Sequence, residues 1–342
     1  MNKDLKVSIL VPVYGVERFI ARCAESLFRQ TYENIEYVFV NDCTKDGSIS
    51  VLKEIMRRFP ERASQVRIIN HERNRGLAAA RNTAVAAATG DFVMHVDSDD
   101  YVDLRIVEKA VGKQLEKDAD VVVIDFKRSY PGFSKIFRYS VFDNAKDYCL
   151  SVLARNNSNS IWAKLIRRSL YTSYGISCKE GCNQGEDFQV VPRLLYNAKV
   201  VVNLQEPLYF YDCSNVGSYT NNFSKSKHDQ NWVSMNIVRD YFIDKGDEYV
   251  AGVCKGRVRQ LVDDLIISAK TSGDTSTYYY NRAIKELSAI DKKYWQAVPL
   301  PKRITLLLAN HFLLMKAYTL VSRALRQSAL KIKDSIQKLF SR

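Results

Sequence analysis

The sequence predicts an α/β protein with a Rossmann-like, mostly parallel sheet flanked by helices, on three observations. Short apolar runs alternate with amphipathic stretches over the first 125 residues. The first run, Lys6–Val13, is largely apolar, as strands buried on both faces are. Each run is followed by a stretch long enough for a helix, and this alternation favours parallel pairing through right-handed crossovers.

The expected elements follow one another in strict order. Strands are expected at Lys6–Val13, Ile35–Val40, Val66–Asn70, Asp91–Val96 and Asp120–Asp125. Helices are expected at Glu17–Arg29, Ser48–Phe59, Leu77–Ala88 and Leu104–Lys117. From about residue 126 the elements become shorter, and beyond about residue 229 the pattern is helical, with breaks expected at Thr271–Thr277 and Val298–Pro301.

The positive charge of the chain is concentrated at its C-terminal end. The 51 Lys and Arg residues outnumber the 38 Asp and Glu residues, which gives a net charge of +13. Residues 302–342 hold nine of these basic residues and one acid, Asp334, and therefore carry +8. A protein that binds nucleic acid over its whole surface should be basic throughout, so this distribution argues against nucleic acid as a partner.

Composition and cysteine usage predict a cytoplasmic protein. Hydrophobic residues make up 46% of the chain, as in soluble globular proteins, and the N-terminus lacks the apolar core of a signal peptide. The seven cysteines are an odd number without a framework spacing, which favours reduced thiols. Cys178, Cys182, Cys213 and His228 could supply zinc ligands, but no Cys-x2-Cys pair is present, so ordinary thiols are favoured.

Acidic residues follow the fourth predicted strand, at the edge where parallel sheets bind ligands. Asp97 and Asp99 are two residues apart, so in an extended backbone they face the same side. A hard divalent cation that also binds substrate phosphate oxygens would relieve their repulsion. A solvated turn, or a cap for the helix near Leu104, is the alternative.

The segment after the second strand has two possible roles. Asp42 follows this strand directly, where a carboxylate could accept a hydrogen bond from a base or a ribose. Asp46 or Ser48 is expected to cap the next helix. For Asp42 the spacing leaves base binding and capping both open.

Taken together and in order, these motifs resemble those of family 2 glycosyltransferases, in particular bacterial enzymes that build capsules and lipopolysaccharide. The matching segments are Val7–Tyr14, Asp42 with Asp46–Ser48, Asn74–Leu77, Ala80–Asn82, Gly90-Asp91, Asp97–Asp100 and Gly185–Asp187. The resemblance is dense over residues 5–125, thinner to about 220 and absent over 226–342.

The resemblance implies a GT-A fold that binds a nucleoside-diphosphate sugar, usually a UDP-sugar, with Mn2+ or Mg2+. Donor-binding positions carried over from the family are Pro12, Val13, Tyr14, Glu17, Asp42, Arg81, Asp97 and Ser98. Asp99 would ligate the metal, and Asp187 would be the base that deprotonates an acceptor hydroxyl. The implied reaction is a single in-line displacement that inverts the anomeric carbon.

The implied base lies at an expected helix start. Gly185-Glu186-Asp187 should open a helix whose N-terminal dipole keeps Asp187 ionised. A simple preference of acids for a first turn is the alternative reading, and Pro192 should kink this helix or delay its start.

The sequence departs from the family pattern at two places. Asn41 and Cys43 stand where the family has a carboxylate and a glycine, which puts base contacts there in doubt. Asp212-Cys213 follows Tyr211 where an Arg is common, so a basic contact to the diphosphate is in doubt. Lys164 is a candidate replacement, although a surface lysine is favoured. His228 is expected to be exposed, and His95 to lie in the core.

The resemblance also divides the chain. Residues 1–225 would form the GT-A domain, with a nucleotide-sugar half (1–125) and an acceptor half (126–225), and 226–342 a helical C-terminal region.

Within 302–342, apolar residues recur at steps of three and four opposite a cationic face, which predicts an amphipathic helix: Val321, Leu325, Ser328, Ala329, Ile332, Ile336 and Leu339. This tail either lies on the anionic inner face of the cell membrane or packs on the body or on a second subunit of a homodimer. The upstream stretch Ile304–Val321 contains Asn310, His311 and Lys316 and is not expected to span a membrane.

We therefore expect an inverting, metal-dependent glycosyltransferase that acts on a glycan or lipid-linked acceptor in cell-surface polysaccharide synthesis. A nucleotidyltransferase should show a Gly-rich loop with Arg and Lys early in the chain, and Val11–Tyr14 offers none. A nicotinamide dehydrogenase needs Gly-x-Gly-x-x-Gly after the first strand, which is missing. A non-enzymatic membrane- or nucleic-acid-binding protein would explain the charge but not the ordered carboxylates.

Overall fold

The chain forms two compact units in a computed structural model that describes residues 4–140, 142, 144–215, 224–322, 324, 325 and 328. The first unit comprises the chain up to residue 152 together with 156–244, and the second comprises 153–155 and the chain from 245 onward. The expected domain boundary at residue 225 precedes α8 (Lys225–Phe242), whereas this division follows it. The helix α8 packs on α7 (Glu186–Asn197) of the first unit.

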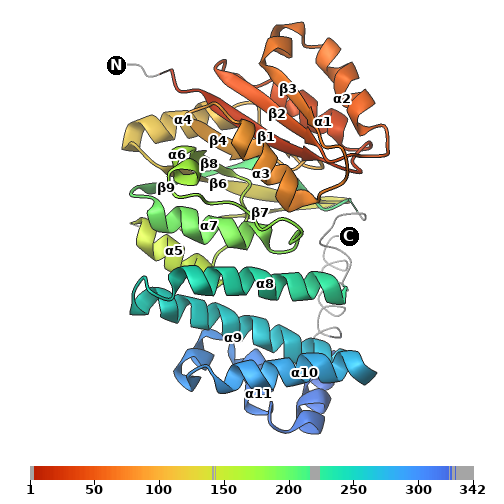
Figure 1. Ribbon diagram of the computed structural model, residues 1–342, viewed down its shortest axis with the longest axis vertical. Coiled ribbons are helices and arrows are strands. Elements are labelled where there is room, and N and C mark those ends of the chain that lie inside the picture. The colour runs from red at the N-terminus through yellow and green to blue at the C-terminus, as the bar shows by residue number, and fades with distance from the viewer. Residues whose placement is uncertain are drawn as a thin grey trace, which may run out of the picture. The chain divides into compact units, whose positions relative to one another are not determined.

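The described residues of the first unit form one nine-stranded sheet (Figure 1). Its strands are β1 Val7–Val13, β2 Ile35–Asn41, β3 Val66–Asn70, β4 Phe92–His95, β5 Tyr101–Val102, β6 Val121–Tyr130, β7 Phe133–Phe137, β8 Lys164–Arg167 and β9 Val201–Asp212. The order across the sheet is β3-β2-β1-β4-β8-β6-β9-β5, and β7 pairs with β6. The sheet is therefore mixed, with four parallel strands (β3, β2, β1 and β4) at one side and a second parallel pair (β6 and β9) beyond the antiparallel β8.

The parallel part of the sheet agrees with the sequence. The strand β1 pairs in parallel with both β2 and β4, and β2 pairs in parallel with β3. Every residue of β1 is buried, as its continuous apolar run predicts. In this register Val13 lies beside Asn41, and Leu10 lies beside His95, so the carboxyl ends of β1, β2 and β4 meet at one edge.

The strand β6 does not continue the parallel pattern directly. It runs in the same direction as β4, but β8 lies between them and is antiparallel to both. On its other side β6 pairs in parallel with β9, through irregular register between Ile124 and Phe126. The sequence did not reveal this arrangement because β8 is short and strand neighbours depend on distant pairing.

Helices cover the sheet in the first unit. They are α1 Ile20–Phe28, α2 Ser48–Arg57, α3 Leu77–Ala87, α4 Ile106–Lys117, α5 Ala145–Leu153, α6 Ser169–Thr172, α7 and α8. In Figure 1 α3 and α7 lie on the near face of the sheet. The helix α7 begins at Glu186, directly after Gly185 with a φ of 78°, and Pro192 lies inside it, so the proline does not delay the helix start.

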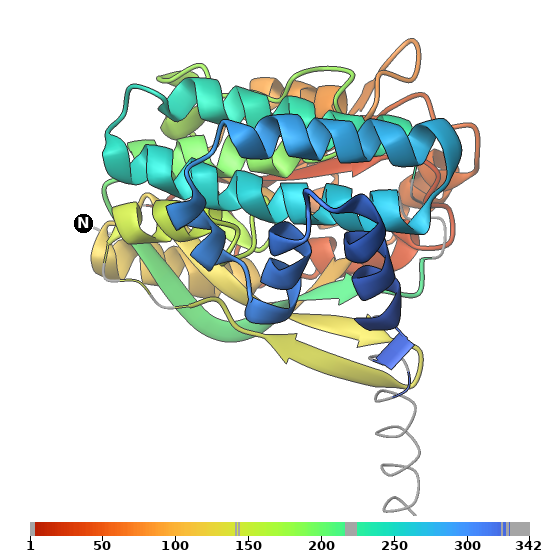
Figure 2. The ribbon, with the colours of Figure 1, turned by 90° about the horizontal axis from the view of Figure 1, so that it is seen from below.

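The second unit is helical in its described residues, as predicted. It contains α9 Asp247–Lys270, α10 Gly273–Ser288 and α11 Leu300–Leu307, and α9 lies beside α10 (Figures 1 and 2). At Gly256 of α9 an added Cβ would lie 2.2 Å from the carbonyl oxygen of Leu153, so the helix can approach this segment only through glycine. The break between α9 and α10 is shorter than predicted, because α10 already begins at Gly273.

None of the described helices is both long enough and apolar enough to cross a membrane. The predicted amphipathic tail is described only in part. Val321 and Leu325 are both exposed, whereas Ile332, Ile336 and Leu339 lie outside the described residues.

Candidate active site

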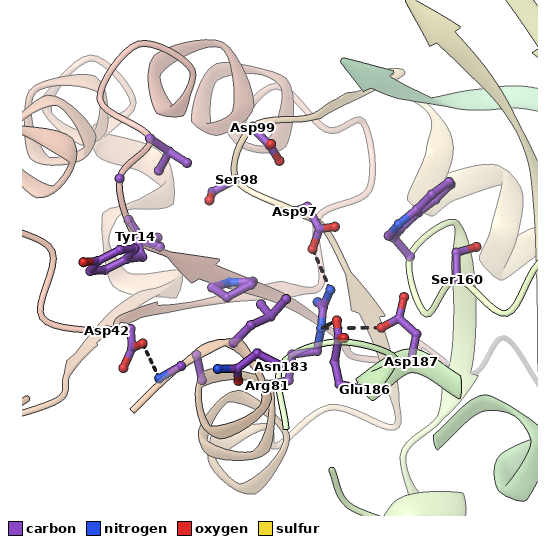
Figure 3. Close-up of a pocket in the computed structure, with 18 of the residues that line it drawn as sticks. Tyr14, Asp42, Arg81, Asp97, Ser98, Asp99, Ser160, Asn183, Glu186 and Asp187 are labelled. Carbon is purple, nitrogen blue, oxygen red and sulfur yellow. Dashed lines mark hydrogen bonds and ion pairs between the residues drawn. The ribbon is translucent and has the colours of Figure 1, made fainter. Parts of the chain in front are cut away.

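A cavity of about 550 Å³ lies at the carboxyl edge of β1, β2 and β4 (Figure 3). Nine of the ten predicted site residues line it: Pro12, Val13, Tyr14, Asp42, Arg81, Asp97, Ser98, Asp99 and Asp187. Lining residues outside the ten predicted site positions include Arg128, Ser160, Trp162, Asn183, Glu186, Tyr211 and Asn215. The structure therefore brings together the two parts of the chain that carry the predicted motifs.

Glu17 is the predicted site residue that does not line the cavity. Its carboxylate accepts a hydrogen bond from the backbone N–H of Gly47 (2.8 Å), and its own N–H donates to Asp46 (3.0 Å). Asp46 also accepts from the N–H and hydroxyl of Ser48, the first residue of α2. Glu17 thus ties the loop after β1 to the start of α2, which stabilises the wall of the cavity.

Asp42 is buried and holds the loop before α3. Its Oδ1 accepts from the N–H of Arg75 (2.8 Å) and its Oδ2 from the N–H of Gly76 (2.7 Å). The ring of His71 lies 2.7 Å from Oδ1 through Nδ1. Asp42 therefore shapes a neighbouring loop, rather than capping its own helix. Cys43 has a φ of 57°, so it keeps the left-handed conformation that glycine adopts more readily at this family position.

The start of α3 is closed by a side chain from a distant segment. Asn183 accepts a hydrogen bond from the N–H of Ala78 (3.0 Å), and an added Cβ at Gly76 would lie 2.2 Å from its amide nitrogen. The positive φ of 87° at Gly76 leaves room for this contact. Sequence spacing could not have revealed Asn183, because it lies 105 residues along the chain from Ala78.

The acidic cluster after β4 divides into two kinds of carboxylate. Asp97 lies 3.0 Å from Nη2 of Arg81, and Asp99 accepts from the amide of Asn215 (2.9 Å). Burial, followed by the charge of Asp97, raises the pKa of Asp99. Asp100 instead accepts from the hydroxyl of Tyr209 (2.7 Å) and the N–H of Asp212 (2.8 Å), and so supports the fold.

Asp187 approaches the cluster from the N-terminus of α7. Its Oδ2 accepts from the N–H of Ile161 (3.1 Å), and its Oδ1 lies 3.6 Å from Nε of Arg81. Burial raises the pKa of Asp187, and Arg81 opposes this shift more than any other group. Burial, followed by the charge of Asp187, raises the pKa of the neighbouring Glu186 to about 8.

Lys164 and His228 differ from their predicted surface positions. Lys164 is buried, and its ammonium donates to the carbonyl oxygen of Ser160 (2.6 Å). Burial lowers the pKa of Lys164 to about 7, and the charge of Asp187 opposes this shift. His228 is also buried, in α8. His95 lies in the core, as predicted, with Nε2 3.1 Å from the hydroxyl of Tyr171.

Arg128 is the main basic residue that the sequence missed. Its guanidinium lies over the rings of Phe137 (4.8 Å) and Tyr211 (5.5 Å) and is not paired with a carboxylate in the part of the chain that the structure describes. Trp162 stacks on Tyr209 (4.7 Å) in the same wall. The predicted strand stopped at Asp125, whereas β6 continues to Tyr130 and carries Arg128 to the cavity.

The cavity lies beyond the carboxyl ends of parallel strands, which is where open α/β sheets bind their ligands. The model of the family "Glycosyl transferase family 2" matches residues 8–180. The chain belongs to this family, which confirms the resemblance inferred from its motifs.

Curated relatives match mainly the first unit. The chain is 32% identical over 225 residues to the glycosyltransferase GlyA of Streptococcus pneumoniae, which covers 62% of this chain and 31% of GlyA. It is also 32% identical over 212 residues to the uncharacterized glycosyltransferase EpsJ of Bacillus subtilis, with 60% of each chain covered. The chain thus spans about a third of GlyA and three fifths of EpsJ.

The likeness to solved structures extends over both units. The crystal structure of residues 1–349 of Staphylococcus aureus TarS in complex with UDP-GlcNAc matches with a TM-score of 0.75 and 21% sequence identity. The match covers 95% of this chain and 92% of that chain. It shows that the two proteins share the GT-A fold with its C-terminal helices.

Proposed function

We propose that the protein is an inverting glycosyltransferase that acts in cell-surface polysaccharide synthesis. It would transfer a sugar from a nucleoside-diphosphate sugar, with a UDP-sugar as the first candidate donor, to a hydroxyl group of a glycan or lipid-linked acceptor. The observation that carries the proposal is the meeting of Asp97, Asp99 and Asp187, from two distant motifs, in one cavity. The similarity to TarS, which was crystallised with UDP-GlcNAc, supports UDP as the nucleotide.

The donor would lie along the β1 and β4 side of the cavity. Tyr14 exposes 53% of its area at this edge, so its ring is free to stack on a base, and Pro12 and Val13 continue the surface. Asp97 and Ser98 would face the ribose or the sugar. Asp42 would act indirectly, through the loop whose N–H groups it holds.

Asp99 fits a divalent cation. Its carboxylate is largely buried beside Asp97, and both effects raise its pKa. A bound cation would lower this pKa again, because positive charge stabilises the ionised carboxylate. Mg2+ and Mn2+ take oxygen ligands and typically complete their shells with substrate phosphate oxygens and water, so Asp99 would be one ligand among these. When bound, the cation supplies stabilisation of the charge that develops on the leaving diphosphate.

Arg128 would provide the basic contact that the Arg missing after Tyr211 provides in relatives. Its guanidinium is held against Phe137 and Tyr211, without a carboxylate partner among the described residues. Such a pre-placed cation suits a phosphate oxygen, because guanidinium binds phosphate through paired hydrogen bonds. Lys164 is less suited, because its ammonium already donates to Ser160.

Asp187 would take the proton from the acceptor hydroxyl as that oxygen attacks the anomeric carbon. The bond from the anomeric carbon to the diphosphate breaks in the same step, so the nucleoside diphosphate leaves and the configuration inverts. A raised pKa strengthens a carboxylate as a base, while Arg81 and the N–H of Ile161 keep it charged. Glu186 is the weaker candidate, because a pKa of about 8 leaves it mostly protonated at neutral pH.

A donor screen tests the proposal. Purified protein is incubated with individual UDP-, GDP- and TDP-sugars and Mn2+, and the released nucleoside diphosphate is measured with and without a chelator. We expect one UDP-sugar to release UDP in a reaction that the chelator abolishes. Absence of release and of thermal stabilisation by every nucleotide sugar would contradict the proposal.

We also propose that the C-terminal helices bind the anionic inner face of the cell membrane, where lipid-linked acceptors lie. Leu313, Leu314, Leu320, Val321 and Leu325 each expose between 44% and 78% of their area. The charge of +8 over residues 302–342 favours anionic lipid and opposes pairing of two copies through this region. The protein would accordingly be cytoplasmic and peripheral to the membrane.

Vesicle co-sedimentation tests the membrane proposal. We expect binding to vesicles that contain phosphatidylglycerol, weak binding to phosphatidylcholine alone, and loss of binding in the double variant Leu313→Ser, Leu314→Ser. Leu115→Ser, at an exposed position of α4, is the matched control. Wild-type binding by the double variant would contradict the proposal.

A further inference from the structure

Arg81 occupies a position where one cation meets three acids. It is 3% exposed, and it lies on α3 in a run of small residues that lets the helix approach the sheet closely. Its Nη2 lies 3.0 Å from Asp97, and its Nε lies 3.5 Å from Glu186 and 3.6 Å from Asp187. These contacts are ion pairs, because Nε and Nη1 of Arg81 and the Oδ1 atoms of Asp97 and Asp187 form no hydrogen bond within the described residues. Arg81 therefore acts on the carboxylates through its charge, which stays ionised when buried.

The orientation of Arg81 differs from the role that the family resemblance implies. In Figure 3 its guanidinium points between Asp97 and Asp187, while Tyr14 and Asp42 lie on the other side of the cavity. The resemblance places this residue facing the nucleotide. Here its charge is already engaged by the carboxylates of two motifs, one after β4 and one at the start of α7.

We propose that Arg81 is a positioning residue that holds Asp97, on the donor side, and Asp187, the base, in one fixed arrangement, and that it does not bind the nucleotide. The inference rests on the proposed function, because it takes Asp187 as the base. Arg81 acts through these two carboxylates, so its removal should affect turnover more than donor affinity.

Electrostatics supports this role. Although burial alone lowers the pKa of Arg81, the charge of Asp97, followed by that of Asp187, raises it well above its usual value, so it remains a cation. Uncompensated carboxylates in such a buried site would be costly, and a neutral group in place of Arg81 would leave Asp97 and Asp187 without their shared partner. The pKa of Asp187 would then rise further, because the charge of Arg81 opposes the rise that burial causes more than any other group does.

Several other groups also influence Asp187 and must be considered in any pH experiment. The titratable and charged groups that face it are Arg81 on α3, Asp97 after β4, Lys164 on β8, Glu186 on α7, and the neighbouring Tyr139, Tyr171 and Cys178. Lys164 also opposes the rise in the pKa of Asp187, but less than Arg81 does.

The test compares Arg81→Met and Arg81→Lys with the wild type. Arg58→Met, which removes an exposed ion pair with Glu25 in the first unit, is the control. UDP affinity is measured by calorimetry with Mn2+, and turnover is measured across pH. For Arg81→Met we expect UDP affinity within about threefold of wild type, turnover lower by about 100-fold or more, and the acid limb of the pH profile at higher pH. Arg81→Lys should recover part of the turnover and part of the pH shift, and Arg58→Met should behave like wild type.

The outcomes separate the possible failures. If Arg81→Met weakens UDP binding by about tenfold or more while turnover at saturation and the acid limb stay unchanged, Arg81 binds the nucleotide and the inference is wrong. If Arg81→Met does not fold, Arg81→Lys decides by the same two readouts. A wild-type protein that turns over no nucleotide sugar contradicts the proposed function itself. Loss of turnover in Asp187→Asn, with normal turnover in both Arg81 variants, contradicts only the role of Arg81.

Discussion

The two halves of the first unit bring residues to one cavity in different ways. The strands β1, β2 and β4 are parallel neighbours, and every residue of β1 and β4 is buried. The strands β6, β8 and β9 mix directions, and β9 has an irregular burial pattern. The first half carries the residues proposed to bind the donor, whereas the second carries Arg128 on β6 and Asp187 at the start of α7. The comparison teaches that local periodicity builds the donor side, while distant pairing builds the side of the base.

The largest expected effect is on the second half, at the proposed base. Asp187→Asn keeps the size of the side chain but removes the proton acceptor. We expect turnover to fall by about a thousandfold or more, while UDP affinity stays within about threefold. Initial rates of UDP release and calorimetric titration with UDP measure the two effects. Turnover near that of wild type would exclude Asp187 as the base.

The next effect belongs to the donor side. Asp99→Ala removes the carboxylate proposed to ligate the metal, so UDP affinity should fall by about 100-fold with Mn2+ and change little in the presence of a chelator. Calorimetry under both conditions measures this difference. Asp100→Asn is a poor control because Asp100 supports the fold, so Asp103→Asn, which is half-buried and lies outside the cavity, is used instead. An unchanged Mn2+ dependence in Asp99→Ala would contradict its role.

A smaller effect is expected at Arg128, the residue of the second half that is proposed to contact the diphosphate. Arg128→Met keeps the apolar contact with Phe137 and Tyr211 but removes the cation. We expect affinity for UDP to fall by about tenfold and affinity for uridine to stay the same, because only UDP carries phosphate. Equal losses for both ligands would indicate that the substitution distorts the site.

The last expected effect concerns stability and its dependence on pH, not ligand binding. Glu186 has a pKa raised to about 8 in the folded protein, against an ordinary value of 4.5, so the folded state binds more protons between these values. Its contribution to stability is therefore present below about pH 4.5 and is lost as pH rises towards 8. Glu186→Gln cannot titrate, so its melting temperature should fall less than that of wild type over this interval. Identical pH profiles in calorimetry would contradict the raised pKa.

Local sequence patterns predicted the parallel strands and the acids after β4, whereas the donor-binding positions came from the family resemblance. The apolar run of β1 and the acids directly after β4 identify both an edge of the sheet and the residues at that edge, because strand ends in a parallel sheet converge. The family motifs added Arg81 and Asp187, which periodicity alone does not assign. The roles of these residues remain predictions.

Distant contacts account for what the sequence could not provide. Asn183 and Asn215 reach α3 and Asp99 from segments more than a hundred residues away. Lys164 and His228 are polar residues in weakly patterned segments and were expected at the surface, yet both are buried. Burial of a polar side chain depends on its tertiary partners, such as the Ser160 carbonyl that accepts from Lys164, and these partners have no local signal.

The most direct test of the central claim is a crystal structure of the protein with UDP and Mn2+. We predict that the uracil ring of UDP lies beside Tyr14, that the cation contacts Asp99, and that the β-phosphate of UDP faces the space in front of Asp187. UDP bound outside this cavity, or a cation held without Asp99, would contradict the claim that the two halves form one glycosyl-transfer site.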